Sequence, residues 1–504
     1  MARAGVDDDL GYPTGRNAEL GPPDTPAPAV QAAPPEHLNH ATRVLASKAI
    51  IHRGWARAVH KRLVVKDHEV VAPSPGVDLE ALARHTAWAV NEERQTTRIV
   101  AWLFWGGGVG LLLLALWAWP STIWWPLLVF ALGSVVAAYV VLIKRTETMQ
   151  DAGRTMARAA DNSVPRRHDE YLIRDDQRRR LVAATEGTVV VYRESGGVDV
   201  FPGFGVRAYD EVRAALDVGV RPHADPPVPG FTATELLQYL AETVGEANTL
   251  QPHQDGRSST LVLHFRGADV WALQQQGRPG FWPTASRIHD AIERPSPAER
   301  AYLRAQVVSR GGQLVTTLHM SVEVRQTGLS LHPIVHVLRR IDGAWNTAKD
   351  LHDSRWRRAL AIATQRGVFG RLASSPADWA RLVRLERRAR REPDDLEEPP
   401  TIIDPYGSRG GLRHYTIGRG NPINTDAADI QRDAAELLRA TYGQVIAFLE
   451  MRGLNPAKYT TDEETLVTNG VLAGVREAIT KSVNGDTTAG DVEYGLQVFE
   501  GRRG

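Results

Sequence analysis

The longest uncharged stretch of the chain is the feature that most restricts its fold. Residues 99–143 contain no ionisable side chain except that of Tyr139. A single helix of this length would span about 68 Å, roughly twice the hydrocarbon core of a bilayer. Pro120 lies near the middle of the stretch and divides it into halves that each match one bilayer crossing. The sequence therefore predicts a transmembrane hairpin.

Tryptophans cluster around this proline, where the two helices of the hairpin would reach the same membrane surface. Indole rings prefer that interface, so an aromatic belt is expected there. It would consist of Trp117, Trp119, Trp124 and Trp125. The expected turn holds no Lys or Arg, whereas basic residues flank both outer ends of the hairpin. By the positive-inside rule, this asymmetry predicts a multi-pass protein of the inner (plasma) membrane with both termini in the cytoplasm.

Small residues in the two expected membrane helices have a spacing that lets helix backbones approach each other. The candidate packing residues are Gly106, Gly110, Gly133 and Ala137. They would pack the two helices on each other or on a second copy of the chain, although glycine is also common in membrane helices without such a role. The expected partners are therefore the lipid bilayer, an unidentified protein and a second copy in a homo-oligomer.

The segment before the hairpin has two parts of different character. Residues 1–36 are rich in proline and in small or polar residues, so we expect them to be disordered. Residues 41–66 carry seven basic side chains, no acidic one and an apolar face. This pattern is typical of a helix lying on anionic lipid, and also of a bundle helix whose basic face is in water.

The clearest strand pattern lies at 314–325, where apolar and polar side chains alternate. Period two with one polar face predicts an antiparallel sheet that has one face in water. Glycine-containing turns on both sides predict neighbouring strands at 305–309 and 329–341, which gives a three-stranded meander. Earlier in the chain, "TVVVYRE" and "TLVLHFRG" also read as strands, and "GFTATELLQYLAETVG" begins like a helix with a capping box.

Four side chains on the polar face of this meander form the candidate metal site. A two-residue turn at Thr327-Gly328 would place His319 opposite His336, and Glu323 opposite His332, with Cβ atoms about 5 Å apart. Imidazole and carboxylate groups are zinc ligands. The alternative is a polar sheet face whose imidazoles are hydrogen-bonded or in water. A bulge at the turn would shift the register and scatter the four side chains.

Several kinds of chemistry are excluded or unsupported. The chain has no cysteine, which excludes disulfides, thiolate zinc sites and a cysteine nucleophile. It has no phosphate-binding loop, nucleophile elbow or zinc-protease motif, and the two glycines of "VFPGFGVRAYD" are too few for a dinucleotide motif. No catalytic residue, cofactor-binding residue or cofactor is predicted. The sequence favours a non-enzymatic protein without excluding an enzyme.

An arginine-rich segment lies at 354–391, and a helix is expected to begin there at Ser375-Pro376. Its basic surface would consist of Arg381, Arg384, Arg387, Arg388, Arg390 and Arg391. Such a surface could contact anionic lipid, an acidic protein or nucleic acid, or it could simply be solvated. No nucleic-acid-binding fold signature accompanies it, so nucleic acid is not expected as a partner.

These patterns divide the chain into seven segments. They are a disordered Pro-rich N-terminus (1–36), an N-terminal cytoplasmic helical region (37–98), the hairpin (99–143), a juxtamembrane helix (144–183), a cytoplasmic α+β domain (184–345), a basic helical segment with a linker (346–400), and a C-terminal helical region with a frayed tail (401–504). The expected fold is an α-helical transmembrane hairpin with a larger cytoplasmic α+β region, in which an antiparallel β-meander is combined with helices.

Several segments together carry a resemblance. They are "VAPSPGVDLEALARH", "TVVVYRESGGVDVFPGFG", "YLRAQVVSRGGQLVTTLHMSVEVRQTGLSL" and the run from "DPYGSRG" through "VIAFLEMRGLNPAKYTTDEETLVTNGV". In this order they resemble a family of uncharacterised two-transmembrane-helix membrane proteins of high-GC Gram-positive bacteria. The resemblance covers the chain from about residue 40. It implies the same architecture and no activity, and the tail "GVREAITKSVNGD" departs from it.

The leading hypothesis is a two-pass membrane protein whose cytoplasmic domains act as a non-enzymatic scaffold or sensor through protein contacts. The first alternative is an accessory membrane subunit of an export, DNA-transfer or defence assembly. The second is a metal-dependent enzyme that uses the His/Glu cluster on the sheet.

Overall fold

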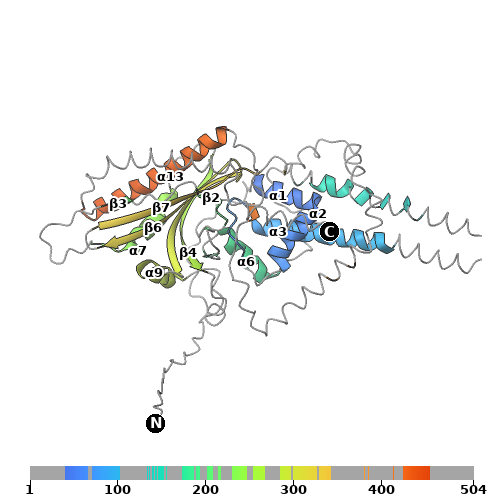
Figure 1. The fold of residues 1–504 in the computed structure, drawn as a ribbon, viewed down its shortest axis with the longest axis horizontal. Coiled ribbons are helices and arrows are strands. Elements are labelled where there is room, and N and C mark those ends of the chain that lie inside the picture. Colours follow the sequence, from blue (N-terminus) through green and yellow to red (C-terminus); the bar gives the residue numbers. More distant parts are fainter. Residues whose placement is uncertain are drawn as a thin grey trace, which may run out of the picture.

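The structure is a computed structural model, and it describes a defined part of the chain. The described residues are 40–65, 71–102, 133, 135–136, 139–140, 142–144, 146–152, 155, 173–186, 189–192, 201, 203–207, 214–216, 230–246, 254–266, 284–296, 299–325, 328–341, 345, 380, 384, 412–413 and 424–454. They form a group of N-terminal helices beside a β-sheet that carries further helices (Figure 1). The expected disordered N-terminus at 1–36 lies outside the described residues.

The N-terminal helices pack around one apolar core. They are α1 (His40–Ile51), α2 (Arg53–His60), α3 (Leu79–Ala101) and α6 (Asp175–Glu186), with a short π-helical turn at Lys61–Val65. The chain breaks between α1 and α2 because His52 is extended. Eight of the twelve residues of α1 are buried, which leaves no broad lipid-facing surface. The described part of the basic stretch, 41–65, therefore forms bundle helices, which was one of the two interpretations of its pattern.

A partly buried ion pair joins two of these helices. Arg57 of α2 donates from Nε to Oε2 of Glu93 at 2.8 Å, and from Nη2 to Oε1 at 2.6 Å. The Glu93 side chain is only 3% exposed. A planar guanidinium matches both carboxylate oxygens at once, so the pair fixes the orientation of α2 on α3.

The structure corrects the prediction of a transmembrane hairpin. No helix among the described residues is both long enough and apolar enough to cross a membrane. Most of the expected hairpin, including residues 103–132, lies outside the described residues. The predicted fold class as a membrane protein, and the predicted multi-pass location in the inner membrane with cytoplasmic termini, rested on that hairpin and are corrected with it.

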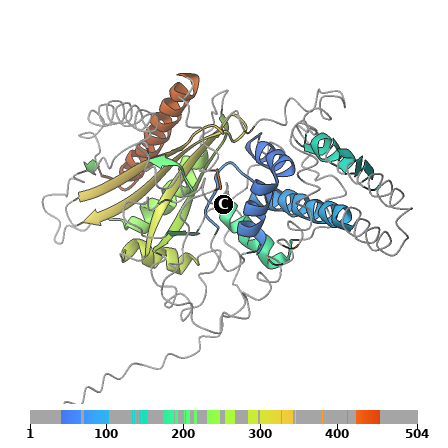
Figure 2. The same cartoon turned by 45° about the vertical axis from the view of Figure 1, so that its right-hand side comes forward.

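Among the described residues, seven strands form one mixed sheet. Figure 2 shows this sheet beside the N-terminal helices. They are β1 (Val189–Tyr192), β2 (Val206–Arg207), β3 (Ala214–Leu216), β4 (Gln254–Arg266), β5 (Glu299–Ser309), β6 (Leu314–Arg325) and β7 (Gly328–Leu338). Their order is β1-β4-β5-β6-β7-β2, and β3 also pairs with β7. The predicted meander is confirmed as β5, β6 and β7, and β6 has the predicted bounds. The sheet is not purely antiparallel, because β1 runs parallel to β4.

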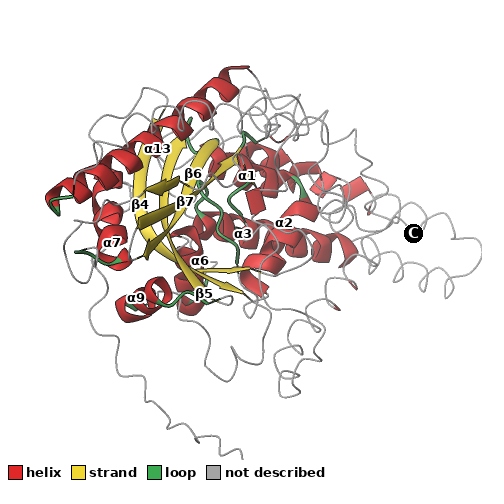
Figure 3. Ribbon diagram, turned by 60° about the vertical axis from the view of Figure 1, so that its left-hand side comes forward, coloured by secondary structure: helices red, strands yellow, loops and turns green. Residues whose placement is uncertain are grey.

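Helices cover one face of this sheet. They are α7 (Ala233–Thr243), α9 (Ala285–Glu293) and α13 (Asn424–Met451), as Figure 3 shows. Their apolar side chains share one core with the sheet, in which Leu237 of α7, Leu437 of α13 and Leu318 of β6 are at most 1% exposed. The predicted cap of α7 is confirmed, since the Thr232 side chain accepts a hydrogen bond from the Glu235 N–H. Gly453, at φ 74°, follows the end of α13.

The register of the central hairpin differs from the prediction by two residues. Arg325 pairs with Gly328, whereas the prediction paired it with Ser330. His319 accordingly lies opposite Ile334, and Glu323 lies opposite Ser330. Because side chains alternate with a period of two, this shift keeps every residue on its predicted face and changes only its neighbours.

The second face of the sheet is covered at Thr317, His319 and His336, whereas the prediction placed the whole face in water; Glu323, toward the end of β6, is exposed as predicted. Thr317, His319 and His336 all have an exposed fraction of 0%. Two aromatic side chains from the segment before β2, Phe201 and Phe204, pack on this face together with Val262 and Tyr302. These three polar side chains are therefore interior groups, and their protonation depends on the residues that surround them.

Candidate functional site

Three histidines from three strands form a buried cluster on the second face of the sheet. His264 of β4, His319 of β6 and His336 of β7 are each at most 1% exposed. Phe201 contacts all three imidazoles, with ring centroids 4.7 Å from His264, 4.3 Å from His319 and 4.7 Å from His336. Phe204 contacts His319 at 4.6 Å. We call these three histidines the histidine cluster.

A hydrogen bond joins two members of the cluster. The Nδ1 atoms of His319 and His336 lie 3.3 Å apart, so one ring donates its N–H and the other accepts. The other nitrogen of His319, Nε2, has no hydrogen-bond partner among the described residues. Such a pair is satisfied when one of the two Nδ1 atoms carries a proton and the other does not.

The surroundings of His319 oppose positive charge. Burial holds the pKa of His319 well below its usual value, and the neighbouring His336, His264 and Arg304 lower it further. Arg304 of β5 lies directly opposite His319 and is itself buried. Burial lowers the pKa of Arg304 to about 10, against a smaller opposing effect of Glu186. The guanidinium therefore stays charged at neutral pH and disfavours a second cation beside it.

The predicted metal site is not assembled as a unit. His319 and Glu323 are four residues apart along β6, about 13 Å at 3.3 Å per residue, as are His332 and His336 along β7. His319 and His336 are buried, whereas Glu323 is exposed. Across the part of the chain that the structure describes, no group of three or more ligating side chains could hold a metal ion. The described geometry thus gives no support to a metal-dependent enzyme.

A second polar feature is the turn between β5 and β6. Arg310, Gly311 and Gly312 have consecutive positive φ angles of 56°, 66° and 76°. This conformation points successive N–H groups in one direction and makes an anion-binding concavity. The N–H groups of Gly311 and Gly312 donate to the Asp255 carboxylate, the latter at 3.2 Å. The Ala41 N–H donates to the Gly311 carbonyl at 3.3 Å, so the same turn also contacts the start of α1.

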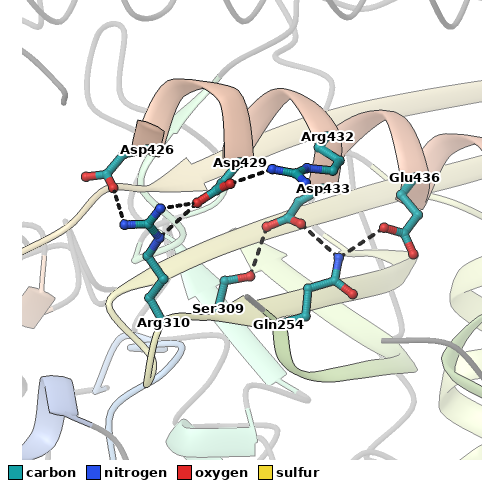
Figure 4. Close-up of polar contacts among 8 residues, drawn as sticks. All are labelled: Gln254, Ser309, Arg310, Asp426, Asp429, Arg432, Asp433 and Glu436. Carbon is teal, nitrogen blue, oxygen red and sulfur yellow. Dashed lines mark hydrogen bonds and ion pairs between the residues drawn. The ribbon is translucent and has the colours of Figure 1, made fainter. Parts of the chain in front are cut away.

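An acidic stripe on α13 docks against this turn and the strands beside it (Figure 4). Asp433, 0% exposed, accepts from Gln254 Nε2 at 2.8 Å and from Ser309 Oγ at 2.9 Å. Asp429 accepts from Arg310 Nε at 2.8 Å. The stripe consists of Asp426, Asp429, Asp433 and Glu436, which helical spacing places on one face of α13. The sequence showed this spacing, but its basic and amide partners come from distant strands.

We expect Asp433→Ala to lower the free energy of unfolding by about 2 kcal/mol. The Ser309 hydroxyl and one of the two Nε2 hydrogens of Gln254 would lose their acceptor, while the other stays bonded to Glu436. Urea denaturation followed by circular dichroism measures the change. The control is Glu450→Ala, since Glu450 is exposed on the same helix and should change stability by less than about 0.5 kcal/mol. Equal effects of the two substitutions would show that the docking contacts do not stabilise α13.

A fully buried arginine links the sheet to the loop before α3. Arg413 donates from Nη1 to the Pro75 carbonyl at 3.0 Å, and from Nη2 to the carbonyls of Gln313 and, at 3.3 Å, Arg339. Beside it, the Leu412 N–H donates to Ser74 Oγ at 3.2 Å. Burial lowers the pKa of Arg413 to about 9, so it remains charged at neutral pH. No motif in the sequence distinguished this arginine from the many others.

Most of the other predicted site residues lie outside the described residues. These are Gly106, Gly110, Ala137, Trp117, Trp119, Trp124, Trp125, Arg381, Arg387, Arg388, Arg390 and Arg391. Of the rest, Gly133 is helical, and a Cβ atom added to it would have no neighbour within 4 Å. Arg384 is exposed, and its Nε donates to the Ala380 carbonyl at 3.3 Å. Packing and lipid roles for this set are not tested by the described contacts.

Comparison with known proteins gives one positive result. Residues 208–481, more than half of the chain, match the family described as the AbeC-like domain. The match begins just after β2 and includes the strands from β3 to β7, the helices α7, α9 and α13, and Arg413. No curated protein and no solved structure matches the chain.

Proposed function

The chain belongs to the AbeC-like domain family, and we propose that it is a non-enzymatic scaffold or sensor that acts through protein contacts, including contacts between copies of itself. Neither the family match nor the described residues indicate an enzymatic activity. The resemblance of its segments to proteins of high-GC Gram-positive bacteria supports the further proposal that it comes from such a bacterium.

One observation carries the proposal: large apolar side chains are exposed at the end of α3 and on the helical residues after 132. Trp102 is 71% exposed, Val135 65% and Tyr139 63%. Single exposed apolar residues are ordinary on a protein surface, but a group of large ones is typical of an interaction site. Aromatic side chains are also the type that most often dominates the binding energy of an interface.

One ion pair joins these two segments: Lys144 Nζ lies 3.2 Å from Oε1 of Glu92 in α3. Within its own segment, Lys144 also lies 3.3 Å from Oε2 of Glu147. A hollow next to this contact is lined from α3 by Trp88 and from the other segment by Met149. The exposed apolar residues follow Glu92 in α3 and precede Lys144 in the other segment, so they extend the same pair of helical segments.

We expect the purified wild-type chain to self-associate at micromolar concentration, and the double variant Trp102→Ser/Tyr139→Ser to do so at least tenfold more weakly. Loss of a central interface aromatic costs 2 kcal/mol or more, and 1.4 kcal/mol is a tenfold change in the dissociation constant. Sedimentation velocity over a concentration series measures this.

The matched control is Met451→Ser, because Met451 is also 63% exposed but lies at the end of α13. It should leave self-association unchanged. A wild-type chain that stays monomeric throughout the series would contradict the proposed self-contact, as would a double variant that associates like the wild type.

A further inference from the structure

A short lid covers the histidine cluster. We define the lid as residues 201–207, of which 201 and 203–207 are described. Its aromatic side chains contact the imidazoles, and its end forms β2, in which Arg207 pairs with His336 of β7. The lid is therefore attached to the sheet at the same place where it buries the histidines.

Two glycines let the lid lie close to other parts of the backbone. Gly203 and Gly205 have φ angles of +94° and +99°, which side-chain-bearing residues rarely adopt. A Cβ atom on Gly203 would overlap the Pro73 carbonyl oxygen, and one on Gly205 would overlap the Val337 carbonyl oxygen. The lid thus lies between β7 and the loop that leads into α3, so its release would loosen the N-terminal helices from the sheet.

We propose that the histidine cluster makes the lid acid-sensitive: in mildly acidic solution His319 takes up a proton, and the lid opens from the sheet while the helix-covered face stays folded. As a sensor, the proposed scaffold would thus respond to a fall in pH. The inference rests on the contacts of the lid and does not require self-association.

The groups that face His319 explain why charging it would open the lid. His336 of β7 already shares the Nδ1 contact, and protonation of both rings would place two N–H groups against each other at 3.3 Å. Arg304 of β5 and His264 of β4 also lower the pKa of His319, because neither contributes a negative charge. Glu186 acts on Arg304, and Tyr302 lies against His264 with ring centroids 4.9 Å apart. Arg207, on the lid itself, is exposed.

The size of the effect follows from proton linkage. With the lid open, an imidazole in water has a pKa near 6.5, whereas with the lid closed the pKa of His319 is well below its usual value. The open state therefore binds more protons below about pH 6.5, and the closed state is fully favoured above it. Between pH 7.5 and 5.5, the release of His319 alone raises the opening equilibrium about tenfold.

Hydrogen–deuterium exchange on the full chain tests this directly. Protection factors, which correct for the intrinsic pH dependence of exchange, should fall about tenfold or more at residues 203–207 between pH 7.5 and 5.5. Those of α7 and of the α13 core should stay constant over the same range. Unchanged protection at 203–207, or an equal loss across the whole sheet, would overturn the proposal.

Two substitutions separate the histidine cluster from general acid sensitivity. His319→Phe keeps an aromatic ring against Phe201. It should make the fall in protection at residues 203–207 between pH 7.5 and 5.5 at least tenfold smaller. His289→Phe, at an exposed position of α9, should leave it unchanged. Phe201→Leu provides a second variant if His319→Phe does not fold, and it should lower protection of the lid already at pH 7.5. If protection at residues 203–207 falls as much in His319→Phe as in the wild type, the proposal is contradicted.

Discussion

Replacing Arg413 by methionine is expected to lower the free energy of unfolding by about 3–5 kcal/mol. The substitution keeps an unbranched apolar stem but removes every donor. The carbonyls of Pro75, Gln313 and Arg339 would then lose a buried partner, and each such loss costs about 1–3 kcal/mol. Burying an apolar side chain in place of a charge offsets part of this cost.

The effect should be concentrated where Arg413 joins the two parts of the molecule. We expect protection of the 71–78 loop against hydrogen exchange to fall before that of the sheet, with total stability measured by urea denaturation. Arg439→Met is the matched control, because Arg439 is exposed on α13. This substitution should change the free energy of unfolding by less than about 0.5 kcal/mol. If Arg413→Met were no more destabilising than this control, Arg413 would not be the group that holds the loop to the sheet.

The second large effect is expected for Gly203→Ala, which should lower the free energy of unfolding by about 3 kcal/mol or more. A positive φ costs a residue with a Cβ atom about 1–2 kcal/mol, and here the Cβ would also overlap the backbone oxygen of Pro73. Backbone cannot move aside as a flexible side chain does. The lid must therefore shift, which removes the contacts of Phe201 and Phe204 with the histidine cluster.

A glycine of α13 supplies the opposite control. Gly443 is helical, and nothing lies within 4 Å of a Cβ placed on it, so Gly443→Ala should stabilise the chain by about 0.5–1 kcal/mol through helix propensity. Thermal unfolding of both variants, together with exchange at the lid, checks the pair. Similar and small effects of the two substitutions would mean that the lid adapts to a side chain at position 203.

Local patterns in the sequence were sufficient for the elements that depend on local forces. Alternation predicted the bounds of β6, glycine-containing turns predicted the meander, and the Thr232 cap of α7 was visible in its spacing to Glu235. Each of these depends on residues within about one turn or one strand of each other.

The candidate site could not be predicted because its parts come from distant segments. The alternation of β6 indicated a polar face, but the aromatic cover of His319 comes from Phe201 and Phe204, more than 100 residues earlier in the chain. The hairpin register depended on which residues form a two-residue connection, and a shift of two residues separated Glu323 from His332 as direct neighbours. Composition left open whether the basic stretch lies on lipid or in a bundle, and the packing of α1 that decides for the bundle comes from other segments.

The position of the lid has a consequence for where a self-sufficient folding unit begins. Sequence similarity to the family starts at residue 208, yet β1, β2 and both lid phenylalanines precede it. A polypeptide starting at 208 would leave one long strand without its parallel neighbour and would open the imidazoles to solvent. The start of the family match is therefore not the start of the folded unit. A truncated protein that begins at residue 208 would lack the strands that complete the sheet and the phenylalanines that cover the histidines.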